Sequence, residues 1–191
     1  MRLLGTQAMG IRLPIINPGD DLVSIVADHV IKVTEHDKLT ANDIVAVTEA
    51  VVAKAEKNFA SISDIAADVK EKFGDETIGL VFPILSRNRF YNILRGIALG
   101  AKRVYVLLSY PNDEVGNPVM DIDKMDEVND TLCGRMSGAA EFRGIAGEFP
   151  HPFTGIDYVK LYNEAGDNVE VFFSNDPRDI LSLTKNVIAP I

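Results

Sequence analysis

Tryptophan is absent from this 191-residue chain, and cysteine occurs once, at Cys133. A single cysteine excludes an internal disulfide, so no disulfide framework supports the fold. The three histidines lack the spacing to another histidine or cysteine that zinc ligands show, which argues against a zinc site. Neither the G-x-G-x-x-G fingerprint nor the Walker A motif is present, so the two familiar nucleotide-binding signatures are missing.

Positive charge is also scarce, with 19 Lys and Arg against 28 Asp and Glu and a formal net charge of -9. Nucleic-acid binding requires a basic surface, so nucleic acid is excluded as a partner, whereas a small phosphorylated ligand needs only a local cluster of donors. No apolar run approaches membrane-spanning length, and the N-terminus lacks a secretion signal pattern. We therefore expect a cytoplasmic protein that does not contact a membrane.

The hydrophobic content of 47% is ordinary for a soluble globular protein and is sufficient for a core. We expect one domain over residues 1–191, the alternative being two small domains that share a core. Strand-like and helix-like apolar periodicities alternate along the sequence. This alternation predicts an α/β fold with a mixed or largely parallel sheet and flanking helices.

The expected elements follow from these periodicities and from turn and cap residues. Strands are expected at residues 43–48, 77–85, 103–109, 168–173 and 186–191. Helices are expected from a cap at Asp20 or Asp21 to Val33, and at residues 64–73, 87–99, 121–132, 154–164 and 177–184, with loops at 111–118 and 134–152. Ligands of such folds bind where strands end and helices begin, which points to residues 48–49, 86–89, 109–117 and 174–178.

Two arginines, Arg87 and Arg89, stand where the chain leaves an expected strand and opens a helix. The positive end of the helix dipole makes a cation there unfavourable by roughly 0.3–1 kcal/mol, so an anion must lie close by. Free backbone N–H groups and two guanidinium groups suit a bound phosphate or carboxylate. The alternative is that the arginines pair with neighbouring acidic side chains.

Further polar candidates follow other strands. Asp113, Glu114 and Asn117 offer oxygen ligands at a spacing compatible with Mg²⁺ or Mn²⁺, although Pro-Asn-Asp and Gly-Asn are also typical of a solvated turn. Lys54 follows the expected strand 43–48 and could reach a nucleotide phosphate, or it lies on a solvated helix face.

Several segments resemble the glutamyl ligases of coenzyme F-420, a deazaflavin cofactor. Residues 10–26, GIRLPIINPGDDLVSIV, and 42–58, NDIVAVTEAVVAKAEKN, are similar to the N-terminal signature of archaeal members. FPILSRNRF, LLSYPNDEVGN and HPFTGIDY resemble a bacterial branch of the same superfamily. Leu13-Pro14-Ile15 and Lys54-Ala55-Glu56 match family positions, whereas Glu49-Ala50 replaces the archaeal Ser-Thr.

The resemblance implies GTP-dependent amide formation by a homodimer that uses Mg²⁺ or Mn²⁺. The γ-phosphoryl group passes to a small carboxylate substrate, and the amine of L-glutamate attacks the acyl phosphate. By position, Leu13, Pro14, Ile15 and Lys54 line the nucleotide site, and Arg87 and Arg89 grip a phosphate or a carboxylate. The archaeal metal motifs are not found, so Asp113, Glu114 and Asn117 stand in for them. The alternative is a non-catalytic or partial domain that binds a nucleotide or another anion.

Overall fold

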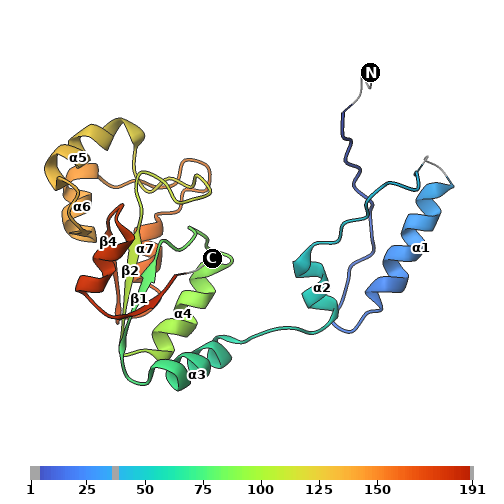
Figure 1. Ribbon diagram of the computed structural model, residues 1–191, viewed down its shortest axis with the longest axis horizontal. Coiled ribbons are helices and arrows are strands. Elements are labelled where there is room, and N and C mark those ends of the chain that lie inside the picture. The colour runs from blue at the N-terminus through green and yellow to red at the C-terminus, as the bar shows by residue number, and fades with distance from the viewer. Residues whose placement is uncertain (1–4, 36–38, 190–191) are drawn as a thin grey trace. The chain divides into compact units, whose positions relative to one another are not determined.

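The computed structural model describes residues 5–35 and 39–189 of the chain. Its internal contacts divide the chain into two compact units, with the boundary between Phe59 and Ala60 (Figure 1). The single domain that we expect over residues 1–191 therefore stays a prediction.

The first unit contains the helices α1 (Leu22–Thr34) and α2 (Glu49–Ala55). Asp21 caps α1 as the sequence predicts, because its side chain accepts a hydrogen bond from the Ser24 backbone N–H at 3.1 Å. The turn before α1 contains Gly19, whose φ of +94° favours glycine. Its backbone N–H donates to the Ala55 carbonyl oxygen at 2.8 Å, so this turn lies against the end of α2.

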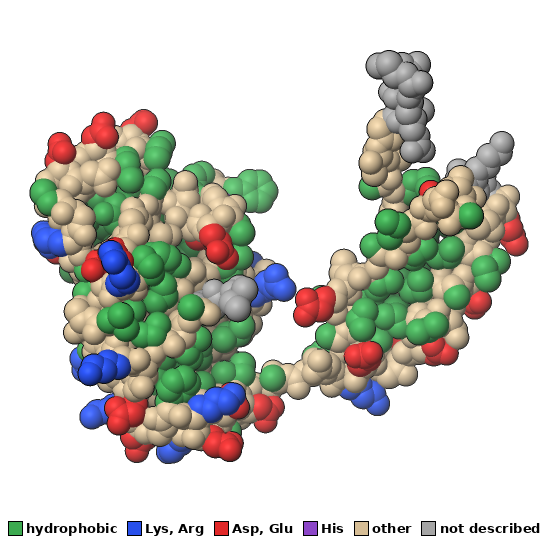
Figure 2. Space-filling view, in the orientation of Figure 1, with side chains coloured by type: hydrophobic (Ala, Val, Ile, Leu, Met, Phe, Trp, Pro, Cys, Tyr) green, Lys and Arg blue, Asp and Glu red, His purple; other side chains and the backbone are tan. Residues whose placement is uncertain are grey.

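Hydrophobic side chains remain exposed across the first unit, and Figure 2 shows them on the visible surface. Ile16 and Ala55 are buried, but α1 has no fully buried residue. The predicted strand 43–48 is wrong: this segment has no strand partner among the described residues, and Ile44 is 91% exposed. The exposed large hydrophobic residues of this unit are Met9, Ile15, Val23, Ile31, Ile44, Val45, Val47 and Phe59.

The second unit contains a five-stranded sheet with the order β3-β4-β2-β1-β5. β1, β2, β4 and β5 pair in parallel, and β3 joins β4 antiparallel. The predicted α/β fold with a mixed, largely parallel sheet is thereby confirmed. The strands are β1 (Thr77–Val81), β2 (Arg103–Leu108), β3 (Ser137–Gly138), β4 (Val169–Phe173) and β5 (Asn186–Ile188).

Seven helical segments flank this sheet in the described part of the second unit. No helix among residues 5–35 and 39–189 is long and apolar enough to cross a membrane. The segments are α3 (Ile62–Phe73), α4 (Phe90–Gly100), η1 (Ile122–Lys124), α5 (Met125–Leu132), α6 (Ala139–Ala146), α7 (Tyr158–Asn163) and η2 (Pro177–Ser182).

The main core lies on one face of the sheet. Alternate residues of β2, Val104 and Val106, are fully buried there with Leu94 of α4, Val128 of α5 and Phe142 of α6. The opposite face is covered by η2, because a side chain at Gly79 of β1 would meet Ile180. Central β1 is therefore covered on both faces, as is typical of a parallel strand, whereas β4 exposes Glu170.

Helices α3 and α4 pack through glycine, and Figure 1 shows them side by side. A Cβ atom on Gly100 would lie 2.4 Å from the Ala66 backbone oxygen, and one on Gly96 would lie 2.6 Å from the Ile65 side chain. Only glycine permits an approach this close. The position of α4, and so of the turn before it, depends on these two residues.

The predicted loop at residues 134–152 is wrong, because it contains β3 and α6. Glycines are typical of irregular loops, but Gly134 and Gly147 have positive φ and lie at the ends of α5 and α6. The predicted helix at 177–184 is the shorter 3₁₀ segment η2, with Asp176 as its cap. Of the predicted strand 186–191, residues 186–188 are confirmed and residues 190–191 lie outside the described residues.

Candidate functional site

Three loops lie at the carboxyl ends of neighbouring parallel strands. They cover residues 82–89 after β1, 109–118 after β2 and 174–176 after β4, where η2 begins. Ligands of α/β proteins bind at this edge of a parallel sheet. Of the four segments predicted to lie at this edge, three do so, namely 86–89, 109–117 and 174–178. The fourth, residues 48–49, belongs to the first unit.

Backbone N–H groups of one loop donate hydrogen bonds to side-chain oxygens of the next, and these bonds connect the three loops. The Leu85 N–H donates to Asp113 Oδ2 at 2.9 Å, which joins the first loop to the second. The Tyr110 N–H donates to Asn175 Oδ1 at 3.0 Å, which joins the second loop to the third. The edge is therefore one hydrogen-bonded structure, although its parts are far apart in the sequence.

Arg87 and Arg89 lie in the turn that precedes α4. The helix begins at Phe90 and not at Arg87, so the predicted start was three residues early. Arg89 is the N-cap residue, its N–H donates to Ser86 Oγ at 3.1 Å, and the first turn of α4 has no acidic residue. Both arginines are exposed, and within the described part of the chain neither guanidinium forms an ion pair.

The backbone just before these arginines is held by a buried tyrosine of α7. The Tyr162 hydroxyl accepts a hydrogen bond from the Ser86 N–H at 2.9 Å and donates one to the Ile84 carbonyl oxygen at 2.8 Å. Burial of the ring raises the pKa of the Tyr162 hydroxyl well above its ordinary value of 10.0, so it stays protonated and keeps its donor. The segment that leads to Arg87 is thus fixed from the core side.

Asp113 uses both carboxylate oxygens within the loops. Oδ1 accepts from the N–H groups of Val115 and Asn117 at 3.1 and 2.7 Å. Oδ2 accepts from the Leu85 N–H and from Asn117 Nδ2, both at 2.9 Å. A carboxylate has about four lone-pair sites, and here each has a donor.

These residues do not fit a site for Mg²⁺ or Mn²⁺, which would need free carboxylate or carbonyl oxygens. Asn117 directs its NH₂ group at Asp113, and Glu114 is exposed with no side-chain hydrogen bond in the described structure. Over residues 5–35 and 39–189, no group of three His, Cys, Asp or Glu side chains could hold a metal ion. The metal role suggested for Asp113, Glu114 and Asn117 stays a prediction that this geometry does not support.

A third arginine at this edge has its own counter-charge. Arg178 donates to Asp176 through Nε at 2.9 Å and through Nη2 at 2.6 Å. These hydrogen bonds lower the pKa of the Asp176 carboxyl from 3.8 to about 2. Ser174, which is buried, donates to Asp179 Oδ2 at 2.6 Å and fixes the start of the same loop. Arg178 is thus neutralised locally, in contrast to Arg87 and Arg89.

The expected nucleotide residues Leu13, Pro14, Ile15 and Lys54 all belong to the first unit. Ile15 is 83% exposed, and Lys54 lies in the last turn of α2 with an exposed side chain. The other candidates, Arg87, Arg89, Asp113, Glu114 and Asn117, belong to the second unit. Each group therefore has to be judged within its own unit.

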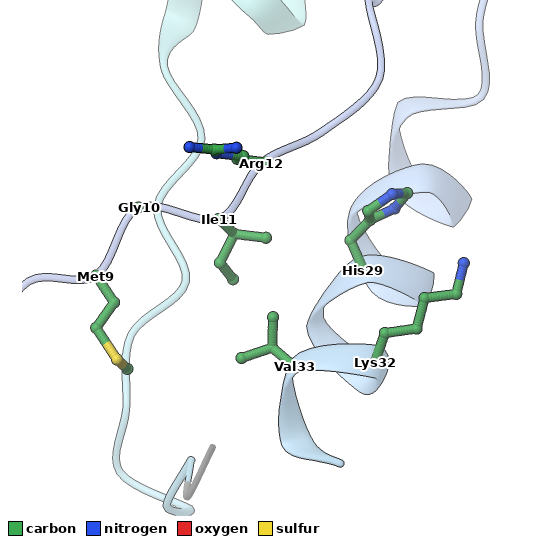
Figure 3. Close-up of a pocket in the computed structure, with 7 residues that line it drawn as sticks. All are labelled: Met9, Gly10, Ile11, Arg12, His29, Lys32 and Val33. Atoms are coloured by element: carbon green, nitrogen blue, oxygen red, sulfur yellow. The ribbon is translucent and has the colours of Figure 1, made fainter. Parts of the chain in front are cut away.

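An open hollow of about 350 Å³ lies in the first unit between residues 9–12 and the α1 residues His29, Lys32 and Val33, and residues 13–15 do not line it (Figure 3). Ile11 and Val33 point into it, whereas the amino group of Lys32 and the ring of His29 point away from its centre. His29 Nδ1 donates to the Ile25 carbonyl oxygen at 2.7 Å, which helps to fix the ring on α1. The hollow is thus apolar at its centre, and neither Lys32 nor His29 directs a donor into it.

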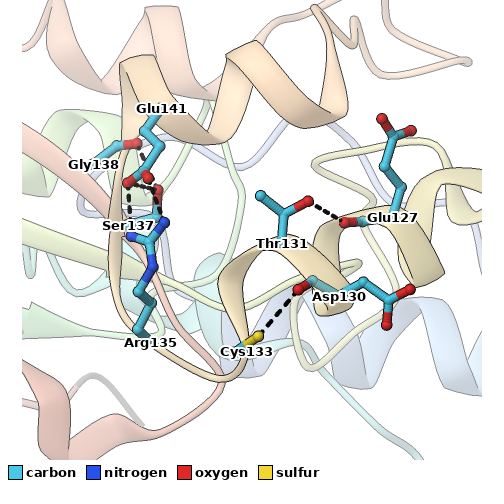
Figure 4. Close-up of polar contacts among 8 residues, drawn as sticks. All are labelled: Glu127, Asp130, Thr131, Cys133, Arg135, Ser137, Gly138 and Glu141. Carbon is cyan, nitrogen blue, oxygen red and sulfur yellow. Dashed lines mark hydrogen bonds and ion pairs between the residues drawn. The ribbon is translucent and has the colours of Figure 1, made fainter.

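A separate polar cluster lies between α5 and α6 (Figure 4). Arg135 binds both carboxylate oxygens of Glu141, and Ser137 Oγ donates to Glu141 Oε2 at 2.8 Å. These hydrogen bonds, that from Arg135 first, lower the pKa of the Glu141 carboxyl from 4.5 to about 2. Cys133 Sγ is engaged with the Asp130 carbonyl oxygen at 3.0 Å. The cluster secures the start of α6 and is distinct from the loop edge.

Sequence reasoning missed Tyr162, Asn175 and the structural use of Asp113. Tyr162 lies in an apolar helix and looks like any core aromatic, because its partners are 76 and 78 residues away. Asn175 lies in the loop that follows β4, and its side chain accepts a hydrogen bond from the Tyr110 N–H. The available signal was positional: a polar residue directly after a parallel strand faces the loops of the neighbouring strands.

Comparisons with known proteins identify a family for the chain. No curated protein and no solved structure matches the chain. The family model described as F420-0:gamma-glutamyl ligase matches residues 10–141. That match includes residues 10–59 of the first unit, the arginine turn and the Asp113 loop. Because it covers more than half of the sequence, the chain belongs to the F420-0:gamma-glutamyl ligase family.

Proposed function

We propose that the protein is a GTP-dependent ligase that joins a small carboxylate to L-glutamate through an amide bond. Family membership supports a γ-glutamyl ligase reaction in the biosynthesis of coenzyme F-420 or of a related product. The proposal extends this to the nucleotide, to an acyl phosphate intermediate, to a homodimer and to action in the cytoplasm.

One observation carries the proposal: two exposed arginines stand at the positive end of α4, on the loop edge of the parallel sheet. Among the described residues no carboxylate neutralises Arg87 or Arg89, whereas Arg178 at the same edge is paired with Asp176. Local repulsion makes this arrangement unfavourable without an anion. A phosphate or carboxylate of the substrates supplies that charge.

The chemistry requires charge neutralisation and positioning more than covalent assistance. A carboxylate oxygen attacks the γ-phosphorus, the bond to the bridging oxygen breaks, and GDP leaves. The glutamate amine then attacks the acyl carbon, phosphate leaves, and the nitrogen loses one proton. Arg87 and Arg89 would hold the carboxylate or the transferred phosphoryl group through two-point hydrogen bonds. Leu13, Pro14, Ile15 and Lys54 remain the proposed nucleotide contacts in the first unit.

A second candidate function is an anion-binding domain without ligase chemistry. It is favoured by the carboxylate of Asp113, whose acceptor sites are all taken by N–H donors. The two functions differ in turnover. A ligase consumes GTP only when both a carboxylate substrate and L-glutamate are present, whereas a binding domain leaves GTP intact under the same conditions.

Thermal unfolding in the presence of GTP, ATP or GDP, each with and without Mg²⁺ or Mn²⁺, tests the proposed site. A ligand at a hundredfold excess over its dissociation constant stabilises the native state by about 2.7 kcal/mol, so the melting temperature should rise with GTP. Changing both Arg87 and Arg89 to alanine should weaken binding by roughly tenfold or more, because a hydrogen bond to a charged group contributes about 1.5–3 kcal/mol.

Arg95→Ala is the matched control, since Arg95 is exposed on the same helix but lies beyond its first turn. It should bind GTP as the unchanged protein does. If the double arginine variant binds both GTP and carboxylates as well as the unchanged protein does, the arginine turn is not the anion site.

A further inference from the structure

We propose that Asp113 is a positioning residue that holds the turn carrying Arg87 and Arg89, and that it is not a ligand of a divalent metal. The inference rests on the proposed anion site at that turn and assigns a role to the carboxylate beside it. It contrasts with the metal role that residue type and spacing suggest for the same side chain.

Hydrogen-bond donors occupy all the acceptor positions of the Asp113 carboxylate. Four N–H donors lie 2.7 to 3.1 Å from the two oxygens of Asp113. Three of the four are backbone groups, from Leu85, Val115 and Asn117, whose positions are set by the loops themselves. A cation could bind Asp113 only by displacing donors that would then be left without an acceptor in a partly buried site.

The donors to Asp113 come from two different loops. The Leu85 N–H belongs to the chain that leads into the arginine turn, and the other donors belong to the loop of Asp113 itself. Asn117 Nδ2 also lies 3.5 Å from the Leu85 carbonyl oxygen. Asp113 and Asn117 therefore hold the peptide groups on both sides of Leu85.

The hydrogen bonds of Asp113 and Asn117 to Leu85 form a clamp, and this clamp lies next to the arginine turn. Tyr162 holds the backbone of Ile84 and Ser86 from the core, while Asp113 holds Leu85 between them. Arg87 follows directly, and the Arg89 N–H is bound to Ser86 Oγ. Loss of the Asp113 acceptor should therefore loosen the turn and weaken anion binding without altering metal binding.

Asp113→Asn in the full chain tests this inference, with Glu114→Gln as the matched control on the adjacent, exposed residue. Mn²⁺ binding is followed by electron paramagnetic resonance with the metal alone. Inorganic tripolyphosphate binding is measured by calorimetry in EDTA. We expect both variants to bind Mn²⁺ within twofold of the unchanged protein, and Asp113→Asn alone to bind tripolyphosphate about tenfold more weakly. A tenfold loss of Mn²⁺ affinity in Asp113→Asn, or unchanged tripolyphosphate affinity, would overturn the inference.

A double-mutant cycle separates positioning from general loosening of the fold. In the background with both arginines changed to alanine, Asp113→Asn should cause no further loss of tripolyphosphate affinity. A further tenfold loss there would contradict a role exerted through the arginines. If Asp113→Asn does not fold, Tyr162→Phe replaces it in the cycle, because it releases the neighbouring Ser86 N–H.

Hydrogen exchange distinguishes failure of this inference from failure of the proposed function. In Asp113→Asn, exchange of the amides at residues 85–90 should accelerate, whereas Glu114→Gln should leave it unchanged. If the unchanged protein does not bind tripolyphosphate, the proposed anion site is wrong, and faster exchange would still establish the clamp. Unchanged exchange at residues 85–90 would exclude the clamp whatever the protein binds.

Discussion

At the scale of single residues, Tyr162 connects the core to the loop edge. Its ring packs near Phe90 at a centroid distance of 5.6 Å, while its hydroxyl bonds the backbone at Ile84 and Ser86. One side chain thus serves both as a core residue and as the hydrogen-bond partner of a loop. Phenylalanine would preserve the packing and remove only the hydroxyl.

We therefore expect Tyr162→Phe to lower the free energy of unfolding by about 1–3 kcal/mol, because a partly buried N–H and a partly buried carbonyl lose their partner. Chemical denaturation followed by circular dichroism measures this difference. Tyr158→Phe is the control, since Tyr158 is buried nearby and no hydrogen bond of its hydroxyl is present in the described structure. A loss from Tyr158→Phe as large as that from Tyr162→Phe would contradict the assignment.

Glu141 gives a prediction about pH. Its folded-state pKa is about 2, below the ordinary value of 4.5, because Arg135 and Ser137 stabilise the carboxylate. A lowered folded-state pKa contributes stability above pH 4.5 that is lost as the pH falls toward about 2. Glu141→Gln should therefore be less stable than the unchanged protein at pH 6, and the difference should shrink below pH 4.5. Denaturant unfolding at several pH values checks this, and a difference that is constant with pH would refute it.

At the scale of elements, replacing glycine by alanine should have opposite effects on stability at two helical positions. One is Gly100 of α4, which contacts α3, and the other is Gly144 of α6. Gly100→Ala should lower the free energy of unfolding by about 1–3 kcal/mol, because the added Cβ meets the Ala66 backbone oxygen. Gly144→Ala in α6 should raise it by up to about 1 kcal/mol, because no atom lies within 4 Å and alanine favours a helix. Thermal or chemical unfolding measures both, and the same sign at both sites would contradict the packing.

The elements that the sequence predicted well are those whose signal is local. Asp21 and the apolar face after it identify α1, and the buried runs of β1 and β2 identify parallel strands. Residues 43–48 carry the same apolar signal, but a strand also requires a neighbour for its backbone hydrogen bonds, and sequence periodicity does not report one. The segment 134–152 failed for the opposite reason, since glycines that end helices look like loop residues.

The position of the candidate site at the edge of the sheet could be predicted from the sequence, but its hydrogen bonds could not. The edge of the sheet and the exposed arginine turn follow from strand order and charge. The bonds of Asp113 to Leu85 and of Tyr162 to Ser86 span 28 and 76 residues, and residue type alone does not distinguish a metal ligand from a loop brace. The deciding quantity is the number of donors around the carboxylate, which only the structure provides.

At the scale of the whole molecule, we expect a homodimer, in agreement with what the family resemblance implies. Val23, Ile31 and Ile44 are among the exposed large hydrophobic residues of the first unit, and exposed apolar surface of this kind is typical of an interaction site. Light scattering coupled to size-exclusion chromatography should give twice the mass of the chain. The mass of one chain at micromolar concentration would contradict the expectation.

Ordering the backbone of a residue costs about 1–2 kcal/mol of conformational entropy. For residues 84–86 that entropy is lost when the chain folds, because Asp113 and Tyr162 already hold their peptide groups. An arriving anion then needs to immobilise only the two arginine side chains. Its capture should therefore be limited by diffusion and not by slow ordering of the turn, so the observed association rate should rise linearly with the anion concentration.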